Sequence, residues 1–409
     1  MKGLALLLAL ALALVLVFQL GDPPDEVAPP AAASRASVER GQYLVRAANC
    51  LSCHTQRGGE PYAGARPIET PFGTLYSSNI TPDPETGIGR WSADDLWRAL
   101  HEGKSRDGSL LYPAFPYTHY TRLRRADADA MFAYLRTVPA VRHANLPHEM
   151  RFPYDKRPLL AGWRTLYFEP ASFKEDPRQS EQWNRGAYLV EVLGHCGACH
   201  GERGGPMPMQ NWYAPSLASD RDTGLGAWDV AEIVELLKTG VAPRGAVFGP
   251  MAEVVRDSLQ HLNGDDLTAM AVYLQSRREE EDPRAQGGTP VSAEQRAQLA
   301  KQGATLYRKH CADCHQKNGE GVPRVYPPLA GNQAILMRNP VNAIRITLNG
   351  GFPPSTAGNP RPYGMPPFAH VLSDREVAAV VTYIRSAWGN GAAPVTPGEV
   401  ASGRGVPLD

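Results

Sequence analysis

The sequence predicts an all-α chain built from three tandem copies of one small helical domain, each arranged around two cysteines and a histidine. Two observations predict this fold. The motif Cys-x-x-Cys-His occurs three times, at residues 50–54, 196–200 and 311–315, and uses all 6 cysteines of the 409 residues. Similar helical segments precede and follow each copy, which indicates an internal triplication. No convincing run of alternating apolar and polar residues indicates strands.

The first helix of each repeat contains a glycine a few residues before the motif. These residues are Gly41, Gly186 and Gly303. A glycine inside a helix costs about 1 kcal/mol, so a merely tolerated glycine would not be expected at one offset three times. We therefore expect each glycine to allow another helix to approach closely.

A middle helix and a closing helix complete each repeat. The middle helices begin at Ser92-x-x-Asp95, at Asp229-x-x-Glu232 and near Pro340, and they stop at Gly103, Gly240 and Gly350. The closing helices have helically spaced apolar residues, namely Met131, Tyr134 and Leu135; Leu267, Met270, Ala271 and Leu274; and Val377, Val380, Val381 and Ile384. A capping box, Ser373-x-x-Glu376, precedes the last of them.

Changes in composition predict the boundaries between these domains. Pro/Ala-rich, Gly/Pro-rich and charged stretches separate the helical regions, and the connector contains aromatic residues that we expect to pack against a domain. The expected order is a signal peptide or membrane anchor (1–20), a linker (21–34), domain 1 (35–142), a connector (143–180), domain 2 (181–278), a linker (279–292), domain 3 (293–390) and a disordered tail (391–409).

The N-terminus predicts export from the cytoplasm. A short positive start, Met1-Lys2, is followed by an apolar run to Leu20, with no good cleavage site directly after it. Eighteen helical residues span about 27 Å, enough for a bilayer core, so we favour an anchor over a cleaved signal peptide. We expect a periplasmic protein tethered to the inner membrane. Equal numbers of basic and acidic residues, 42 of each, argue against a nucleic-acid partner.

The spacing Cys-x-x-Cys-His is typical of covalent haem c attachment, in which two thiols bond to the haem vinyl groups and the histidine binds the iron. A zinc site needs four ligands, and no cysteine remains to complete one. A thioredoxin-like redox pair would be expected near a βαβ pattern, and a disulfide between cysteines so close in sequence is rare. The sequence therefore predicts three haem c groups, attached through Cys50, Cys53, Cys196, Cys199, Cys311 and Cys314.

The iron ligands follow in part from the same reasoning. The motifs supply proximal His54, His200 and His315. Met365, flanked by Gly364 and two prolines shortly before the last helix, is a good distal ligand, and Met251 stands at a similar place in the second repeat. Carbonyl groups of Pro327 and Pro215 are expected to accept hydrogen bonds from the third and second proximal imidazoles, whereas the first repeat has no clear equivalent.

The first repeat lacks a methionine at the corresponding place. Phe115 cannot bind iron, and His119 is the nearest candidate distal ligand, with a hydrogen-bonded loop histidine as the equal alternative. Met131 fits core packing better, because it lies on the apolar stripe of the closing helix. A first haem without a strong distal ligand is the third possibility.

Five stretches carry a resemblance to a known family. They are residues 70–83 (TPFGTLYSSNITPD), 85–91 (ETGIGRW), 111–117 (LYPAFPY), 211–217 (NWYAPSL) and 249–255 (GPMAEVV). With them, residues 37–390 resemble the membrane-associated trihaem cytochrome c subunits of bacterial periplasmic dehydrogenases. Members of this family serve quinoprotein alcohol dehydrogenases, flavoprotein gluconate or sorbitol dehydrogenases, and molybdenum hydroxylases of the nicotinate or isoquinoline type.

The resemblance implies three class-I-like cytochrome c domains, each wrapped around a covalently attached haem, and an electron-relay role. It also implies the same proximal histidines, with Met251 and Met365 as distal ligands. The chain departs from the family at Phe115, where some relatives have Met. It also departs after Asn390, where a polar, Pro/Gly-rich tail shifts anchoring to residues 3–20.

We expect a relay of electrons from a catalytic dehydrogenase subunit to a quinone, an oxidase or a soluble cytochrome, without substrate chemistry in this chain. A haem enzyme with an exchangeable distal site at the first haem is the alternative that the missing methionine motivates. A zinc-stabilised interaction module is a weaker third hypothesis.

Overall fold

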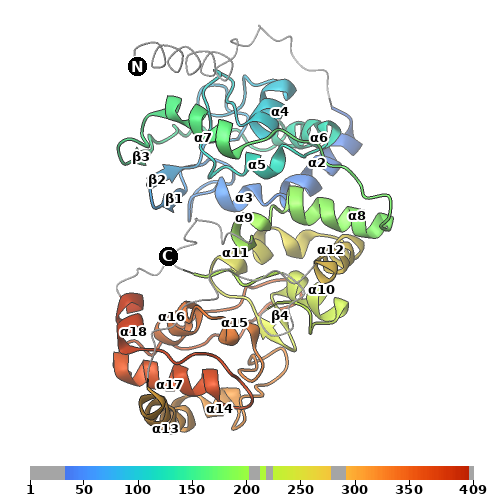
Figure 1. The fold of residues 1–409 in the computed structure, drawn as a ribbon. Helices are drawn as coiled ribbons and strands as arrows, with labels where there is room; N and C mark the ends of the chain where they lie inside the picture. The colour runs from blue at the N-terminus through green and yellow to red at the C-terminus, as the bar shows by residue number, and fades with distance from the viewer. Residues whose placement is uncertain (1–32, 202–211, 218–223, 278–291, 405–409) are drawn as a thin grey trace, which may run out of the picture. The chain divides into compact units, whose positions relative to one another are not determined.

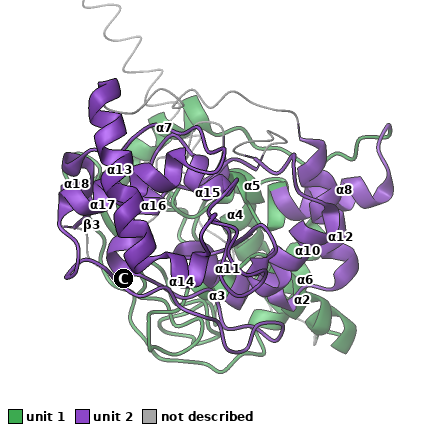
Figure 2. Cartoon of the chain, turned by 90° about the horizontal axis from the view of Figure 1, so that it is seen from below, with its two compact units in different colours: residues 1–177, 191–198 green, residues 178–190, 199–409 purple. Residues whose placement is uncertain are grey.

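In the computed structural model, the described residues are 33–201, 212–217, 224–277 and 292–404. The chain forms two compact units, shown in green and purple in Figure 2. Unit 1 comprises residues 1–177 and 191–198, and unit 2 comprises residues 178–190 and 199–409. The boundary therefore passes through the second motif, after Ala198.

Unit 1 consists mainly of helices joined by long loops (Figure 1). The helices are α2 (Arg35–Ala47), α3 (Cys50–Cys53), α4 (Ala93–Glu102), α5 (Tyr117–Tyr120), α6 (Arg125–Leu135), the 3₁₀ turn η1 (Arg157–Leu159) and α7 (Leu160–Tyr167). The strands are β1 (Pro67–Thr70), β2 (Gly73–Tyr76) and β3 (Glu149–Met150).

Unit 2 is also mainly helical. Its helices are α8 (Glu181–Tyr188), α10 (Val230–Thr239), α11 (Pro250–Asp257), the 3₁₀ turn η3 (Leu259–His261), α12 (Gly264–Ser276), α13 (Ala293–His310), α14 (Ala312–His315), α15 (Gln333–Leu336), α16 (Val341–Asn349), α17 (Asp374–Ser386) and α18 (Pro397–Arg404). Its strands are β4 (Val241–Ala242) and β5 (Gly245–Ala246). The π-helical turn η2 (Leu189–Leu193) and α9 (Gly197–His200) cross the boundary between the units.

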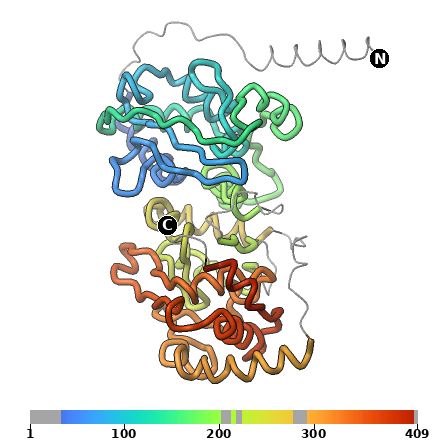
Figure 3. The backbone as a smooth tube through the Cα atoms, turned by 90° about the vertical axis from the view of Figure 1, so that its left-hand side faces the viewer, coloured from blue at the N-terminus to red at the C-terminus, as the bar shows by residue number. Residues whose placement is uncertain are grey.

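One helix pairing occurs three times: α2 with α6, α8 with α12, and α13 with α17. The α13–α17 pair is visible in orange and red in Figure 3. At each crossing a glycine faces the partner backbone. A Cβ added to Gly41, Gly186 or Gly303 would lie 2.6, 2.6 or 2.7 Å from the carbonyl carbon of Ala130, Ala269 or Ala379, respectively. The expected role of these glycines in close helix approach is confirmed, because any side chain would push the helices apart.

The middle helices α4, α10 and α16 begin and end where the sequence predicts. Ser92 with Asp95 and Asp229 with Glu232 form capping boxes, and α16 begins directly after Pro340. Gly103, Gly240 and Gly350 stop the three helices with φ of 62°, 82° and 65°, positive values that glycine adopts without strain. Ser373 and Glu376 form the predicted capping box of α17.

The prediction of a chain without strands is wrong in detail, although the chain is mostly helical. Strands β1, β2 and β3 form an antiparallel sheet in the order β1-β2-β3, and β4 pairs with β5. Each strand has only two to four residues, too few to show an alternating pattern in the sequence. Strand β3 lies in the predicted connector and pairs with β2. Phe168, one of the connector's aromatic residues, packs edge-on against Tyr117, as expected.

The predicted disordered tail also requires correction. Helix α18 occupies residues 397–404 and packs against α16 and α17. Val395 and Val400 are fully buried, which explains why this Gly/Pro-rich segment is ordered. The predicted N-terminal segment (1–20), most of both linkers, and the last five residues lie outside the described residues. Among the helices that the structure describes, none combines the length and apolar character needed to cross a bilayer.

Candidate haem-binding sites

Each cysteine motif lies in or beside a short helix that follows the glycine-containing first helix. In unit 1, Asn49 adopts a left-handed conformation between α2 and α3 and turns the chain sharply into Cys50. In unit 2, α13 leads almost directly into α14. All six cysteines lie in the described part of the chain, and none of them forms a disulfide. Three pairs of reduced thiols are what the attachment of three haems through thioether bonds requires.

The three motif histidines share one hydrogen-bonding pattern. The Nδ1 atoms of His54, His200 and His315 lie 2.7, 2.6 and 2.9 Å from the carbonyl oxygens of Ser78, Pro215 and Pro327, respectively. A carbonyl oxygen only accepts hydrogen bonds, so Nδ1 is the donor and Nε2 is left with its lone pair. This is the tautomer that a metal-binding imidazole needs.

The expected Pro215 and Pro327 carbonyl partners are confirmed, whereas Ser78 was missed. In the second and third repeats the partner follows the histidine by 15 and 12 residues, but Ser78 follows His54 by 24. The β1–β2 hairpin lies between them and lengthens the loop. The spacing seen in the other two repeats therefore could not identify the carbonyl partner of His54.

Burial favours the neutral form of the three motif histidines. Removal from water lowers the pKa of His54, His200 and His315, while the hydrogen bond to the carbonyl opposes this shift. Desolvation is the larger effect in all three, so each imidazole stays neutral at pH 7. Neutral imidazole is the form that binds iron.

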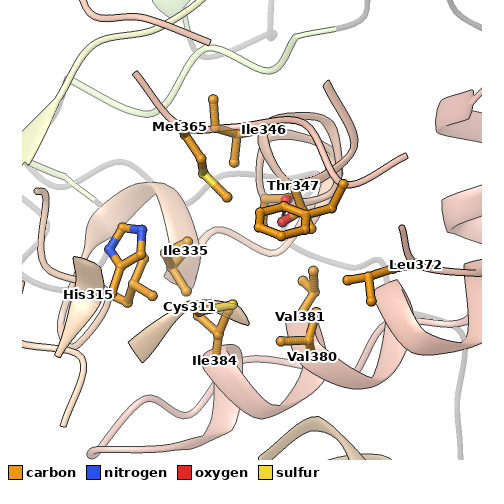
Figure 4. A pocket seen from close by; sticks show the side chains of 13 residues that line it. Cys311, His315, Ile335, Ile346, Thr347, Met365, Leu372, Val380, Val381 and Ile384 are labelled. Atoms are coloured by element: carbon orange, nitrogen blue, oxygen red, sulfur yellow. Dashed lines mark hydrogen bonds between the residues drawn. The ribbon is translucent and has the colours of Figure 1, made fainter. Parts of the chain in front are cut away.

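The third repeat contains an apolar pocket bounded by its motif and by Met365 (Figure 4). It is partly open to solvent. Its lining includes Cys311, His315, Ile335, Met365, Val380 and Ile384. The Met365 side chain extends into the pocket from a different segment from the one that carries His315.

The chemistry of the residues that line this pocket suits a haem group. Cys311 and His315 supply the attachment chemistry at one side, and aliphatic side chains of α15, α16 and α17 form walls that suit the apolar faces of a porphyrin. The loop that carries Met365 is held by two backbone hydrogen bonds with Gly351, of 2.8 and 3.0 Å. Two prolines after Met365 restrict the loop further. The sulfur is therefore held on a rigid segment, as a distal ligand should be.

Met251 occupies the first turn of α11, after Pro250, and its side chain is half-buried. The preceding Gly249 has φ of 58°, and a Cβ there would lie 2.7 Å from the Trp212 ring. Cys199, His200 and Met251 all belong to unit 2.

His119 lies on α5 and contacts residues 191–198 of its own unit. Its Nδ1 donates a hydrogen bond to the Glu191 carbonyl oxygen at 3.1 Å. A Cβ added to Gly197 would lie 3.4 Å from His119 Cε1. As in the three motif histidines, this bond leaves Nε2 with its lone pair, so it fits both the hydrogen-bonded histidine and the iron ligand that the sequence predicts as alternatives.

A buried polar contact near the first motif was missed in the sequence. The Tyr120 hydroxyl donates to the Ala48 carbonyl oxygen at 3.0 Å and lies 3.3 Å from His195 Nδ1. Removal from water lowers the pKa of His195 to about 4, so this imidazole is neutral at pH 7. His195 directly precedes Cys196, and Ala48 lies two residues before Cys50. The available signal was a tyrosine and a histidine next to motif residues, but their pairing depends on the fold.

All three repeats match the same family of known proteins. The profile of the cytochrome c family matches residues 38–139, 184–278 and 300–388. The cytochrome c subunit of a quinone-dependent alcohol dehydrogenase from Gluconobacter oxydans is 39% identical over 90% of this chain and 81% of its own length. The gluconate 2-dehydrogenase cytochrome c subunit of Pantoea cypripedii is 39% identical over 90% of each chain. The fructose dehydrogenase cytochrome subunit of Gluconobacter japonicus is 34% identical over 93% of this chain and 86% of its own length.

Proposed function

The chain belongs to the cytochrome c family, and from this premise we propose that it is a trihaem subunit that relays electrons from a catalytic dehydrogenase subunit. The family and the relatives support haem c binding and an electron-transfer role in a dehydrogenase complex. The observation that carries the proposal is the third pocket, where an apolar cavity is bounded by Cys311 and His315 on one segment and Met365 on another.

The proposed haem attachments are the three cysteine pairs, with His54, His200 and His315 as proximal ligands and Met251 and Met365 as distal ligands at the second and third sites. Haem c, when bound, supplies an iron centre that gains and loses one electron. The protein holds each proximal imidazole in one tautomer through a backbone carbonyl. In the third pocket the mostly aliphatic lining would limit contact between water and the haem, which would keep its surroundings similar before and after a change in charge.

The finer parts of the proposal concern partners and location. We place a quinoprotein, flavoprotein or molybdenum dehydrogenase upstream and a quinone, an oxidase or a soluble cytochrome downstream. We place the protein in the periplasm, held at the inner membrane by residues 1–20, whose sequence is apolar enough for a signal peptide or an anchor.

The haem count tests the core of this proposal. Full-length protein matured in cells that attach haem c should carry three haems per chain by pyridine haemochrome assay and intact mass. Cys50→Ser/Cys53→Ser and Cys311→Ser/Cys314→Ser should each carry two, whereas a matched pair of serine substitutions outside the motifs, Ser37→Ala/Ser402→Ala, should keep three. Wild-type protein without bound haem would overturn the proposal.

The relay role is tested separately. Each of the three classes of dehydrogenase, supplied with its substrate, is mixed with the oxidised cytochrome, and haem reduction is followed at its visible absorption bands. Rapid substrate-dependent reduction by one class identifies the partner. Reduction by none of them, with all three haems present, would count against a dehydrogenase partner.

A further inference from the structure

Within unit 2, the segment 212–217 joins the second repeat to the third. Asn342 of α16 forms a reciprocal pair of hydrogen bonds with it: Oδ1 accepts from the Tyr213 N–H at 2.9 Å, and Nδ2 donates to the Tyr213 carbonyl oxygen at 2.7 Å. Gln333, the first residue of α15, donates through Nε2 to the Ser216 carbonyl oxygen at 3.1 Å. Side chains of the third repeat therefore hold a segment that follows the second motif.

The same segment supplies the hydrogen-bond acceptor of the second motif histidine. The Pro215 carbonyl oxygen accepts from His200 Nδ1 at 2.6 Å. This carbonyl shares one planar peptide group with the N–H of Ser216, and Tyr213 stands two residues before it. The ring of Pro215 removes further freedom by fixing φ. The third repeat therefore holds the backbone on both sides of the atom that accepts the His200 hydrogen bond.

The carbonyl partners of the other two motif histidines are held differently. His54 donates to Ser78 within unit 1. His315 donates to Pro327 of its own repeat, in a loop closed by a backbone hydrogen bond of 2.7 Å from the Leu329 N–H to the Gly319 carbonyl oxygen. The second site differs from both, because hydrogen bonds from another repeat flank its acceptor.

The second and third repeats also meet away from the segment 212–217. Thr356 Oγ1 donates to the Thr239 carbonyl oxygen at 3.0 Å. A Cβ added to Gly351 would lie 3.5 Å from the ring of Phe248. These contacts keep the two repeats together when one amide side chain is removed from α15 or α16, so such a variant tests the position of the segment and not the assembly of the unit.

The hydrogen bond of His200 bears on the redox chemistry of the second site. Donation from Nδ1 to a carbonyl oxygen orients the imidazole and makes it a more basic ligand. A more basic ligand stabilises ferric iron over ferrous iron and lowers the reduction potential, one of the ways in which a protein tunes a haem. Loosening the Pro215 carbonyl should weaken this bond and raise the potential.

We propose that Asn342 and Gln333 are positioning residues for the second haem: they hold the Pro215 carbonyl against His200 and thereby lower the reduction potential of this haem. The inference rests on the proposed attachment of haem to the second motif. Helices α15 and α16 line the third pocket through other side chains, including Ile335. One pair of helices therefore serves two redox sites.

Redox titration of the full-length protein, monitored in the visible range with the haem content measured in parallel, tests this. Asn342→Ala should raise the potential of one haem. Gln333→Ala should raise the same potential by less, because it removes one hydrogen bond to the segment where Asn342→Ala removes two. The protein with Cys196→Ser/Cys199→Ser identifies the second potential, which it lacks.

Asn339→Ala is the matched control. Its exposed side chain accepts a hydrogen bond of 3.0 Å from the Val341 N–H at the start of α16, so the substitution loosens the same helix without removing the hydrogen bonds of Asn342. It should leave all three potentials unchanged. If Asn342→Ala loses the second haem, Gln333→Ala decides the outcome.

Two results would overturn the inference and leave the relay function intact. One is an unchanged second potential in the Asn342 and Gln333 variants with three haems bound. The other is an equal rise in Asn339→Ala, which would assign the effect to general loosening of α16. A wild type without the second haem would instead be a failure of the proposed function.

Discussion

The first and third motif regions have the same helical framework and differ in the loop that supplies the candidate distal ligand. Both have a glycine-mediated helix crossing, a capped helix, and a proximal histidine that donates to a carbonyl. The third has Met365 in its pocket, whereas the first has Phe115 in the corresponding loop. The comparison teaches that the scaffold and the iron chemistry are set by different residues. The helix crossings build the scaffold, and the proposed distal ligand comes from a loop outside them.

The same two regions differ in how their helix pairs are joined. In the first, Arg40 forms an ion pair with Asp127, whose side chain is 1% exposed. In the third, Gln302 precedes the crossing glycine, and Glu376 caps its own helix by accepting hydrogen bonds from Ser373. The crossing is nevertheless equally close in both, so the glycine contact, and not the ion pair, is the shared element.

The largest effect is expected from substitutions that disrupt the glycine contact at the helix crossing. Gly41→Ala and Gly303→Ala should each destabilise their own region by on the order of 3 kcal/mol, because a methyl group must displace the backbone of the partner helix. Urea unfolding followed by circular dichroism, together with haem content, measures this. The control is Gly264→Ala, a helical glycine with no atom within 4 Å of the added Cβ, which should change stability by less than about 0.5 kcal/mol. An effect of Gly303→Ala no larger than the control would show that the close contact contributes nothing.

The second prediction makes the third region resemble the first. Met365→Phe should lower the potential of one haem by on the order of 100 mV, within the roughly 0.8 V range that axial ligands cover, and should let that haem bind carbon monoxide. A redox titration monitored in the visible range measures the potential. Met337→Leu is the control, because Met337 is buried but does not line the pocket. An unchanged potential in Met365→Phe would remove Met365 as a ligand.

The ion pair of the first region gives a smaller effect. Asp127→Asn should cost about 1.5 kcal/mol, since it weakens a charge-assisted hydrogen bond to a buried acceptor. The control is Asp129→Asn in the same helix, whose pairing with Arg125 is exposed and should contribute less than about 0.5 kcal/mol. Equal effects of the two substitutions in urea unfolding would mean that burial of Asp127 adds nothing to its pairing.

The smallest expected effects concern the helix caps. Ser92→Ala and Ser373→Ala should each cost about 1 kcal/mol, whereas Ser402→Ala, at an exposed position inside α18, should be close to neutral. The hydrogen bonds from Ser373 hold the pKa of Glu376 below its usual 4.5. The stability that this cap contributes is therefore present above pH 4.5 and lost as the pH falls below it. A Ser373→Ala effect that is the same at pH 7 and pH 3.5 would contradict this assignment.

The sequence by itself determined the features that depend on neighbouring residues. The cysteine motifs, the helix caps, the glycine stops and the carbonyls of Pro215 and Pro327 all lie within short stretches, where spacing and side-chain chemistry act locally. The role of the crossing glycines could also be predicted from the sequence, because the same unfavourable residue recurs at one offset in three helices.

Only the tertiary structure decided the features that join distant segments. Strand β3 pairs with β2 about 75 residues away, Val395 and Val400 order a tail whose composition indicates disorder, and His119 donates to Glu191 across 72 residues. A short strand or an apolar pair in a tail is stabilised by its partner, and its own sequence holds too little information to identify that partner. The Ser78 carbonyl belongs to the same class, since the β1–β2 hairpin brings it to His54.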